Sequence, residues 1–239
     1  LSILFYPILK GIYGPPILSW APDTKDWPDW LSWSNVLTSE MLICGRFVIE
    51  LYVGIELYKN GYIDNAKRHM KHPKSELYSD IIPTFKAKNS KGFTVELENL
   101  ATAVEGEKDF IFISSKYKNL SDAITVNENY IEDSSKSLTK RIILVRSSLK
   151  IAADEYAVGI VNGEVKNKFE YQDALGFTIV AKNILKNTTT QSKEEEIKKN
   201  KVLKIIENLS DLWPSLVPTG IVDGDAKIIL DAVTKINLV

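Results

Sequence analysis

The chain has 239 residues, of which 44% are hydrophobic and 26% are charged, and this composition is typical of a globular protein rather than a disordered one. Its 30 basic and 31 acidic side chains give a net charge of −1, which argues against a nucleic-acid-binding protein, because such proteins carry a basic excess on one face. A single cysteine excludes an intramolecular disulfide and a zinc site built from cysteines. The sequence begins at Leu1 rather than methionine, and it leaves open whether a targeting segment precedes it.

The first 35 residues are apolar, rich in proline and tryptophan, and without helical periodicity. We predict no regular transmembrane helix here, because prolines at this density would leave backbone groups unpaired in lipid. Tryptophan favours positions where one edge of the ring is dry and the other is wet. We therefore predict an extended docking arm over residues 1–35, although folding back over its own core is an alternative. Its expected contacts with a partner are aromatic: Phe5, Tyr6, Tyr13, Trp20, Trp27, Trp30 and Trp33.

The rest of the chain has the apolar spacing of helices joined by short connections. The first helix begins at Ser34 or Ser39 and ends at Asn60-Gly61. Further helices are predicted over residues 63–72, 75–88, 94–104, 194–212 and 226–236. The run FIFI within residues 106–118 is β-prone, but we favour a helix because no second strand is present for it to pair with.

The strongest helical pattern covers residues 127–161. Its apolar stripe consists of Ile131, Leu138, Ile142, Val145, Leu149, Ala153, Tyr156 and Ile160. Asn162 and Gly163 end this helix, and Asn167 followed by Glu170 has the spacing of a capping box that starts the next one. The predicted fold is all-α: an antiparallel bundle of about six to eight helices over residues 36–239, preceded by the arm.

The candidate metal ligands lie in one short run of sequence. His69 and His72 are the only histidines, and their spacing places both rings on one helix face, with Glu76 shortly after. Glu50 or Glu56 on the preceding helix could approach them. Imidazoles with a carboxylate suit zinc, iron or copper. The alternative is that both histidines lie at the surface or cap the helix, since neighbouring lysines and an arginine oppose a divalent cation.

Signatures of catalysis are absent from the sequence. It contains no nucleophile elbow, no phosphate-binding glycine loop and no dinucleotide fingerprint. The run Asp223-Gly224-Asp225 lacks the further ligands of a calcium loop, so we predict a turn and a helix cap there. We therefore expect a protein that is not an enzyme.

Two segments resemble known families. Residues 45–85 are similar to a helix pair of small exported α-helical proteins of cyanobacteria, whose second helix carries the run A-x-x-H-x-x-H-P-x-x-E-x-Y. That run is matched by Ala66, His69, His72, Pro73, Glu76 and Tyr78. Residues 155–177 are similar to a stretch of those proteins and of the periplasmic helical region of bacterial high-affinity iron permeases. The shared motifs are matched by Glu155-Tyr156, Gly163-Glu164-Val165 and Glu170-Tyr171.

The resemblance implies a periplasmic or thylakoid-lumen setting and contact with iron. If the ancestor was cyanobacterial, the resemblance also implies that the chain is a plastid protein that became a fixed subunit of a photosynthetic membrane assembly. The main hypothesis is therefore a non-catalytic accessory or scaffold subunit without a cofactor, which docks its bundle onto a membrane-protein complex such as a photosystem or light-harvesting assembly. Its arm would contact subunits of that complex, the membrane surface, or bound pigment or lipid. The alternative is a periplasmic-type metal-binding protein that holds iron or another transition metal at His69, His72 and Glu76.

Overall fold

The computed structural model describes residues 48–73, 78–130, 136–218 and 220–239. These residues belong to one compact unit that comprises residues 37–239. The whole predicted arm lies outside the described residues, and so do Glu76 and the predicted boundary at residue 35. The aromatic partner contacts therefore stay a prediction.

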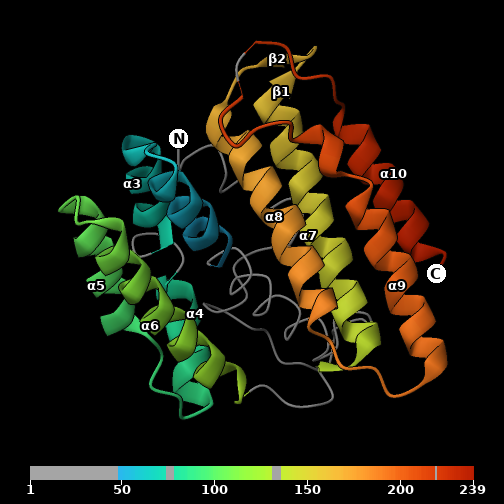
Figure 1. Cartoon of the computed structure of the whole chain (residues 1–239). Coiled ribbons are helices and arrows are strands. Elements are labelled where there is room, and N and C mark those ends of the chain that lie inside the picture. The colour runs from blue at the N-terminus through green and yellow to red at the C-terminus, as the bar shows by residue number, and fades with distance from the viewer. Residues whose placement is uncertain (1–47, 74–77, 131–135, 219) are drawn as a thin grey trace, which may run out of the picture. The chain divides into compact units, whose positions relative to one another are not determined.

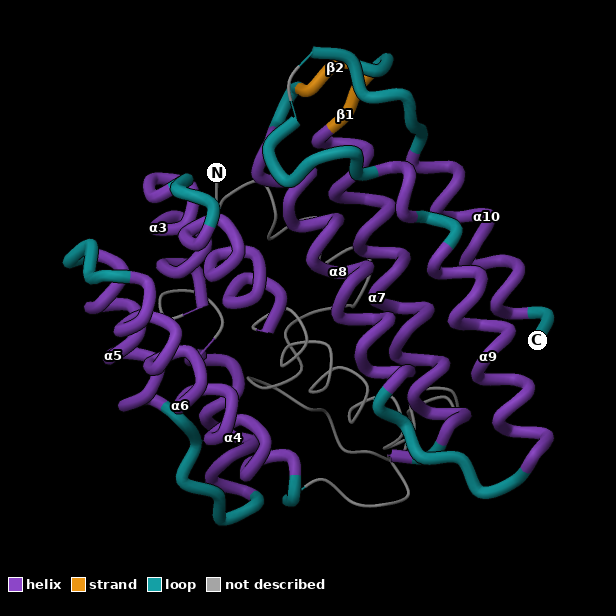
Figure 2. The backbone as a smooth tube through the Cα atoms, viewed as in Figure 1, coloured by secondary structure: helices purple, strands orange, loops and turns teal. Residues whose placement is uncertain are grey.

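The described residues are mostly helical, which confirms the all-α prediction (Figure 1; Figure 2). Residues 48–59 form the first described helical segment. After it come α3 (Ile63–His72), α4 (Tyr78–Ala87), α5 (Thr94–Glu105), α6 (Phe110–Glu128), α7 (Leu138–Gly159), α8 (Lys168–Lys186), α9 (Lys193–Glu207), the 3-10 turn η5 (Ser210–Leu212) and α10 (Ala226–Asn237). Two short strands, β1 (Ile160–Val161) and β2 (Glu164–Val165), lie between α7 and α8.

Side-chain caps start several of these helices where the sequence indicates them. The predicted cap Asn167 accepts a hydrogen bond from the backbone N–H of Phe169 at 3.1 Å. Asp225 likewise starts α10, which confirms the predicted cap, while residues 223–225 have no regular turn. At α6, Asp109 accepts from the backbone N–H of Phe112 at 2.9 Å, so the β-prone run FIFI begins a capped helix, as expected.

The helix predicted over residues 127–161 corresponds to α7, which begins only at Leu138. α6 ends at Glu128, and Ser137 has extended backbone (ψ 151°) directly before α7. The connecting sequence is polar and rich in serine, a residue that favours helix termini over helix interiors. The residues of the predicted apolar stripe from Leu138 to Ile160 are buried, as expected, and Ile131 lies outside the described residues.

Asn162 and Gly163 end α7 by forming a β-hairpin. Both have positive φ, 54° and 75°, the signature of the two-residue turn that joins antiparallel strands. β1 pairs with β2 through Ile160 opposite Val165. The carbonyl of Gly163 also accepts a hydrogen bond from the backbone N–H of Val222 at 2.8 Å. The Asn-Gly pair thus turns the chain back from α7 into α8 and holds the segment that precedes α10.

Helices α7–α10 pack on one another, with α7 and α8 side by side along their length (Figure 1). The two helices approach closely at Gly159, where a Cβ atom would lie only 2.7 Å from the backbone nitrogen of Tyr171. Next to this crossing the rings of Tyr156 and Tyr171 lie 6.1 Å apart, and Trp213 packs edge-on against Tyr156 at 5.5 Å. This aromatic cluster joins α7 and α8 to the chain after η5.

Glycines also let the segment 48–59 approach two other helices. A Cβ atom at Gly176 of α8 would lie 2.4 Å from Cγ2 of Ile49, and one at Gly54 would lie 2.9 Å from Cε of Met70 in α3. Segment 48–59 therefore packs against both α3 and α8. These contacts bring polar side chains from all three helices to one buried place.

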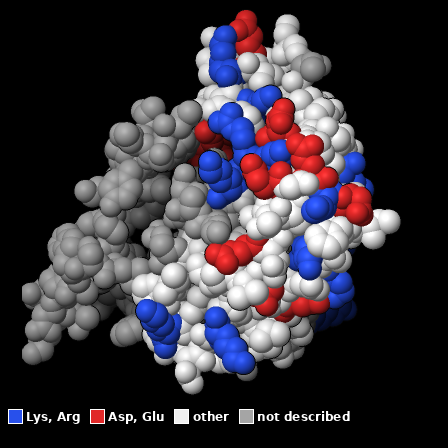
Figure 3. Space-filling view, turned by 90° about the vertical axis from the view of Figure 1, so that its left-hand side faces the viewer, with Lys and Arg blue, Asp and Glu red and all other residues white. Residues whose placement is uncertain are grey.

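Charged side chains of both signs are interspersed on the face shown in Figure 3. Ion pairs among the described residues include Lys67 with Glu107 at 2.7 Å and Lys118 with Asp122 at 2.6 Å. Among the helices of the described residues, none combines the length and the apolar character needed to cross a bilayer.

Replacing Gly159 by alanine should destabilise the protein, although this exchange inside a helix normally stabilises it. The added Cβ would meet backbone atoms of Tyr171, which side-chain rotation cannot move away. We expect the free energy of unfolding, measured by urea denaturation, to fall by about 1–3 kcal/mol. Exposed Val158 offers a control in the same turn: Val158→Ala should have a much smaller effect. Equal stability of Gly159→Ala and wild type would contradict the close crossing of α7 and α8.

Candidate metal centre

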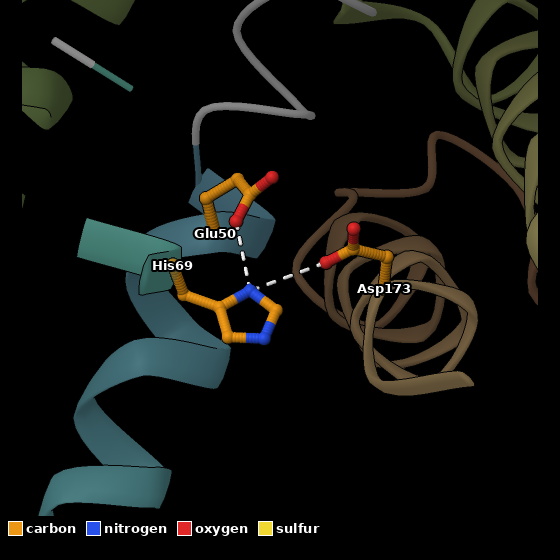
Figure 4. A group of neighbouring side chains, drawn as sticks. All are labelled: Glu50, His69 and Asp173. Carbon is orange, nitrogen blue, oxygen red and sulfur yellow. Dashed lines mark hydrogen bonds and ion pairs between the residues drawn. The ribbon is translucent and has the colours of Figure 1, made fainter. Parts of the chain in front are cut away.

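Three helices each contribute one ionisable side chain to a buried cluster (Figure 4). Glu50 comes from segment 48–59, His69 from α3 and Asp173 from α8. Their exposed fractions are 2%, 2% and 8%. One potential ligand atom from each lies within 4.8 Å of the other two, so a single ion could contact all three.

The imidazole of His69 presents one nitrogen to both carboxyl groups. Its Nδ1 atom lies 2.8 Å from Oε2 of Glu50 and 3.3 Å from Oδ1 of Asp173. The N–H group points at the nearer oxygen, so the hydrogen bond goes to Glu50. Oδ1 of Asp173 is left without a hydrogen-bond donor among the described residues. A buried carboxylate oxygen without a donor is costly, and a bound cation would satisfy it.

Gln172 faces the other nitrogen of the ring. Its Oε1 lies 3.1 Å from Nε2 of His69, and its own Nε2 donates to the carbonyl of Leu216 at 3.1 Å. Phe169 packs near the imidazole, with ring centroids 6.0 Å apart, and the Arg68 guanidinium lies 3.8 Å above the Phe169 ring. The imidazole is thus held by polar contacts at both nitrogens and is covered by an aromatic side chain.

Electrostatics keep His69 protonated when no ion is bound. Burial lowers the pKa of His69, but the close contacts and negative charges of Asp173 and Glu50 outweigh this and raise the pKa from 6.5 to about 10. Burial and the charge of Glu50 raise the pKa of the Asp173 carboxyl to about 6. An imidazolium between two carboxyl groups is therefore the resting state at neutral pH.

The structure brings only part of the sequence-predicted ligand set together. His69 lies in the cluster, and Glu50 approaches it as one of the two carboxylates considered. Glu56 is not in the cluster and pairs with Lys59 at 3.8 Å. Glu76 and the side chain of His72 lie outside what the structure describes, so their roles stay predictions.

Sequence reasoning missed Asp173. The residue lies four positions before Phe177 on the buried face of α8, so it is a carboxylate at a position where an apolar residue is expected. Neighbouring Gln172 is completely buried as well. Two consecutive polar residues in the core of one helix are the signal that could have pointed to this site.

Residues 132–238 match the model of the iron permease-associated 4-helix bundle domain. This range contains α7–α10 and confirms the similarity of this part to the helical region of iron permeases. The match covers less than half of the chain and contains Gln172 and Asp173 but not Glu50 or His69. No curated protein and no solved structure matches the chain significantly.

The raised pKa of His69 makes the stability of the metal-free protein depend on pH. Because the folded pKa is about 10 and the unfolded value is 6.5, the stabilisation is complete below pH 6.5 and is lost as the pH rises through about 10. Other groups titrate in the same window, so the useful quantity is the difference in free energy of unfolding between wild type and His69→Gln. With chelator present, this difference should shrink by about 1 kcal/mol per pH unit between pH 7 and 10. A difference that stays constant over this window would show that His69 is neutral in the fold.

Proposed function

We propose that the protein is a non-catalytic metal-binding protein that holds one divalent transition-metal ion, with ferrous iron as its cargo, between Glu50, His69 and Asp173. The observation that carries the proposal is Oδ1 of Asp173, which lacks a hydrogen-bond donor among the described residues and is buried beside an imidazole and a second carboxylate. The similarity of residues 132–238 to a domain associated with iron permeases supports iron as the ion.

The charges of the cluster suit a divalent ion. When no ion is bound, the Nδ1 proton of His69 lies where the ion would contact the ring. A divalent cation would displace that proton, and its two positive charges would balance the two carboxylates around a neutral imidazole. Binding thus replaces one buried proton by a cation that also contacts the carboxylate of Asp173.

The ligand types narrow the choice of metal without fixing it. One imidazole nitrogen and two carboxylate oxygens suit ferrous iron, manganese and zinc better than cuprous copper, which prefers sulfur. Three protein ligands leave coordination positions for water or for a donor from a transfer partner. Zinc is expected to compete on affinity alone, so selection of iron in the cell would depend on supply.

The similarity connects the bundle with iron transport and with membrane proteins in general. It is compatible with a membrane-associated or periplasm-facing setting. A scaffold role for the aromatic arm in a photosynthetic, thylakoid or plastid assembly has no support from the comparisons and stays a prediction.

Metal titration of the purified, chelator-stripped protein tests the proposal. We expect wild type to bind one equivalent of Fe(II) under anaerobic conditions, and Zn(II) as a redox-stable probe, measured by calorimetry and by competition with a chromophoric chelator. Asp173→Asn and Glu50→Gln should each weaken binding at least about tenfold, because each removes a charged ligand while keeping its shape. Asp122→Asn, at an exposed carboxylate of α6, should bind like wild type.

Two outcomes would overturn this assignment. One is a wild-type protein that binds neither ion, and the other is full affinity in Asp173→Asn and Glu50→Gln when circular dichroism shows both to be folded. His72→Ala separates the two proposed ligand sets. Loss of binding in that variant, with no loss in Asp173→Asn, would favour the set of His69, His72 and Glu76.

A further inference from the structure

We infer that Gln172 is a positioning residue that makes His69 bind the ion through Nδ1, by keeping a proton on the opposite ring nitrogen. This inference rests on the proposed function. It concerns which atom of His69 becomes the ligand and why the ring presents that atom to Glu50 and Asp173.

The orientation of the Gln172 amide follows from its second contact. A backbone carbonyl can only accept a hydrogen bond, so the group that faces Leu216 O at 3.1 Å must be the NH₂ group. The amide oxygen then faces Nε2 of His69 at 3.1 Å. Because that oxygen can only accept, Nε2 of the imidazole must carry a hydrogen.

The carbonyl of Leu216 belongs to a segment that is fastened to α8 next to Gln172. The hydroxyl of Tyr171 donates to Ser215 O at 2.8 Å, and the indole N–H of Trp213 donates to Tyr171 O at 3.2 Å. Gln172 is completely buried, so water is not expected to replace either of its partners. The amide is therefore fixed from the side opposite the imidazole.

Fixing the Nε2 proton decides where the lone pair of a neutral imidazole lies. With hydrogen on Nε2, the lone pair is on Nδ1, which faces both carboxyl groups. The competing tautomer would place hydrogen on Nδ1, bonded to Glu50, where the ion must bind. It would also leave Nε2 and the oxygen of Gln172 facing each other without a hydrogen between them. Gln172 thus disfavours the tautomer that excludes the ion.

The experiment compares Gln172→Met with Gln172→Glu. Methionine has a similar length but offers only a weak acceptor, so the affinity for Zn(II) should fall about 10- to 100-fold. Glutamate keeps an acceptor for the Nε2 proton and should retain Nδ1 ligation, although it loses the bond to Leu216. Gln191→Met, at an exposed glutamine, is the matched control and should bind like wild type.

Nitrogen-15 NMR of the His69 imidazole reports which ring nitrogen binds the metal. This assignment would not depend on Gln172 if the residue only stabilised the fold. In a His72→Gln background His69 is the remaining histidine, so its ring nitrogens are assigned without ambiguity. In the zinc-loaded protein we expect a metal-bound Nδ1 and a protonated Nε2. Ligation through Nε2 would overturn the inference.

The results separate the inference from the proposed function. If the protein with Gln172 intact binds neither Fe(II) nor Zn(II), the proposed function fails. If it binds zinc and Gln172→Met keeps both full affinity and Nδ1 ligation, the inference is wrong and the metal site stands. If Gln172→Met does not fold, the spectrum of the zinc-loaded protein with Gln172 intact still decides between the two ring nitrogens.

Discussion

The contact on which the described structure depends is the buried imidazole of His69 between two carboxyl groups. Removing three ionisable side chains from water is costly, and the cost is offset only when they face one another at short range. Glu50, His69 and Asp173 come from three helices, so their pairing fixes the positions of those helices. The close approaches at Gly54 and Gly176 make this possible, because any larger side chain there would hold the helices apart.

The cluster also joins two parts of the chain, of which only the second matches a known family model. Helices α7–α10 lie within the match to the iron permease-associated bundle domain and supply Asp173 and Gln172. Segment 48–59 and α3 lie before that match and supply Glu50 and His69. Both of the chain's histidines precede residue 132, so the matched range alone offers carboxylates but no imidazole. A centre with a nitrogen ligand therefore requires both parts of this chain.

Local chemistry explains which features the sequence predicted. Asn167 caps α8, Asp225 caps α10 and the apolar stripe of α7 is buried, because each depends on residues a few positions apart. Glu50 was within reach of prediction because its helix and α3 are consecutive. The contact of His69 with Gln172 joins residues 103 positions apart, and no periodicity of a single sequence records such a pairing. Asn162-Gly163 was predicted correctly as a break after the helix, but its hairpin was not predicted, because the same positive φ that ends a helix also forms a hairpin.

Buried carboxylate and imidazole groups can also serve only to fix a fold, and the two roles make different demands on the geometry. A cluster built only for stability gains most when every polar atom has a partner, since an unpaired buried oxygen costs more than a hydrogen bond returns. Here Nε2 of His69 and both ends of the Gln172 amide are hydrogen-bonded, whereas Oδ1 of Asp173 has no hydrogen-bond donor and only the ion-pair contact with Nδ1 of His69 at 3.3 Å. Within the cluster, the oxygen that lacks a donor lies on the side of the ring where the two carboxyl groups converge. A cation bound there would give this oxygen a partner. If the cluster served stability alone, apolar side chains of similar volume would fill the same space at a lower cost in free energy.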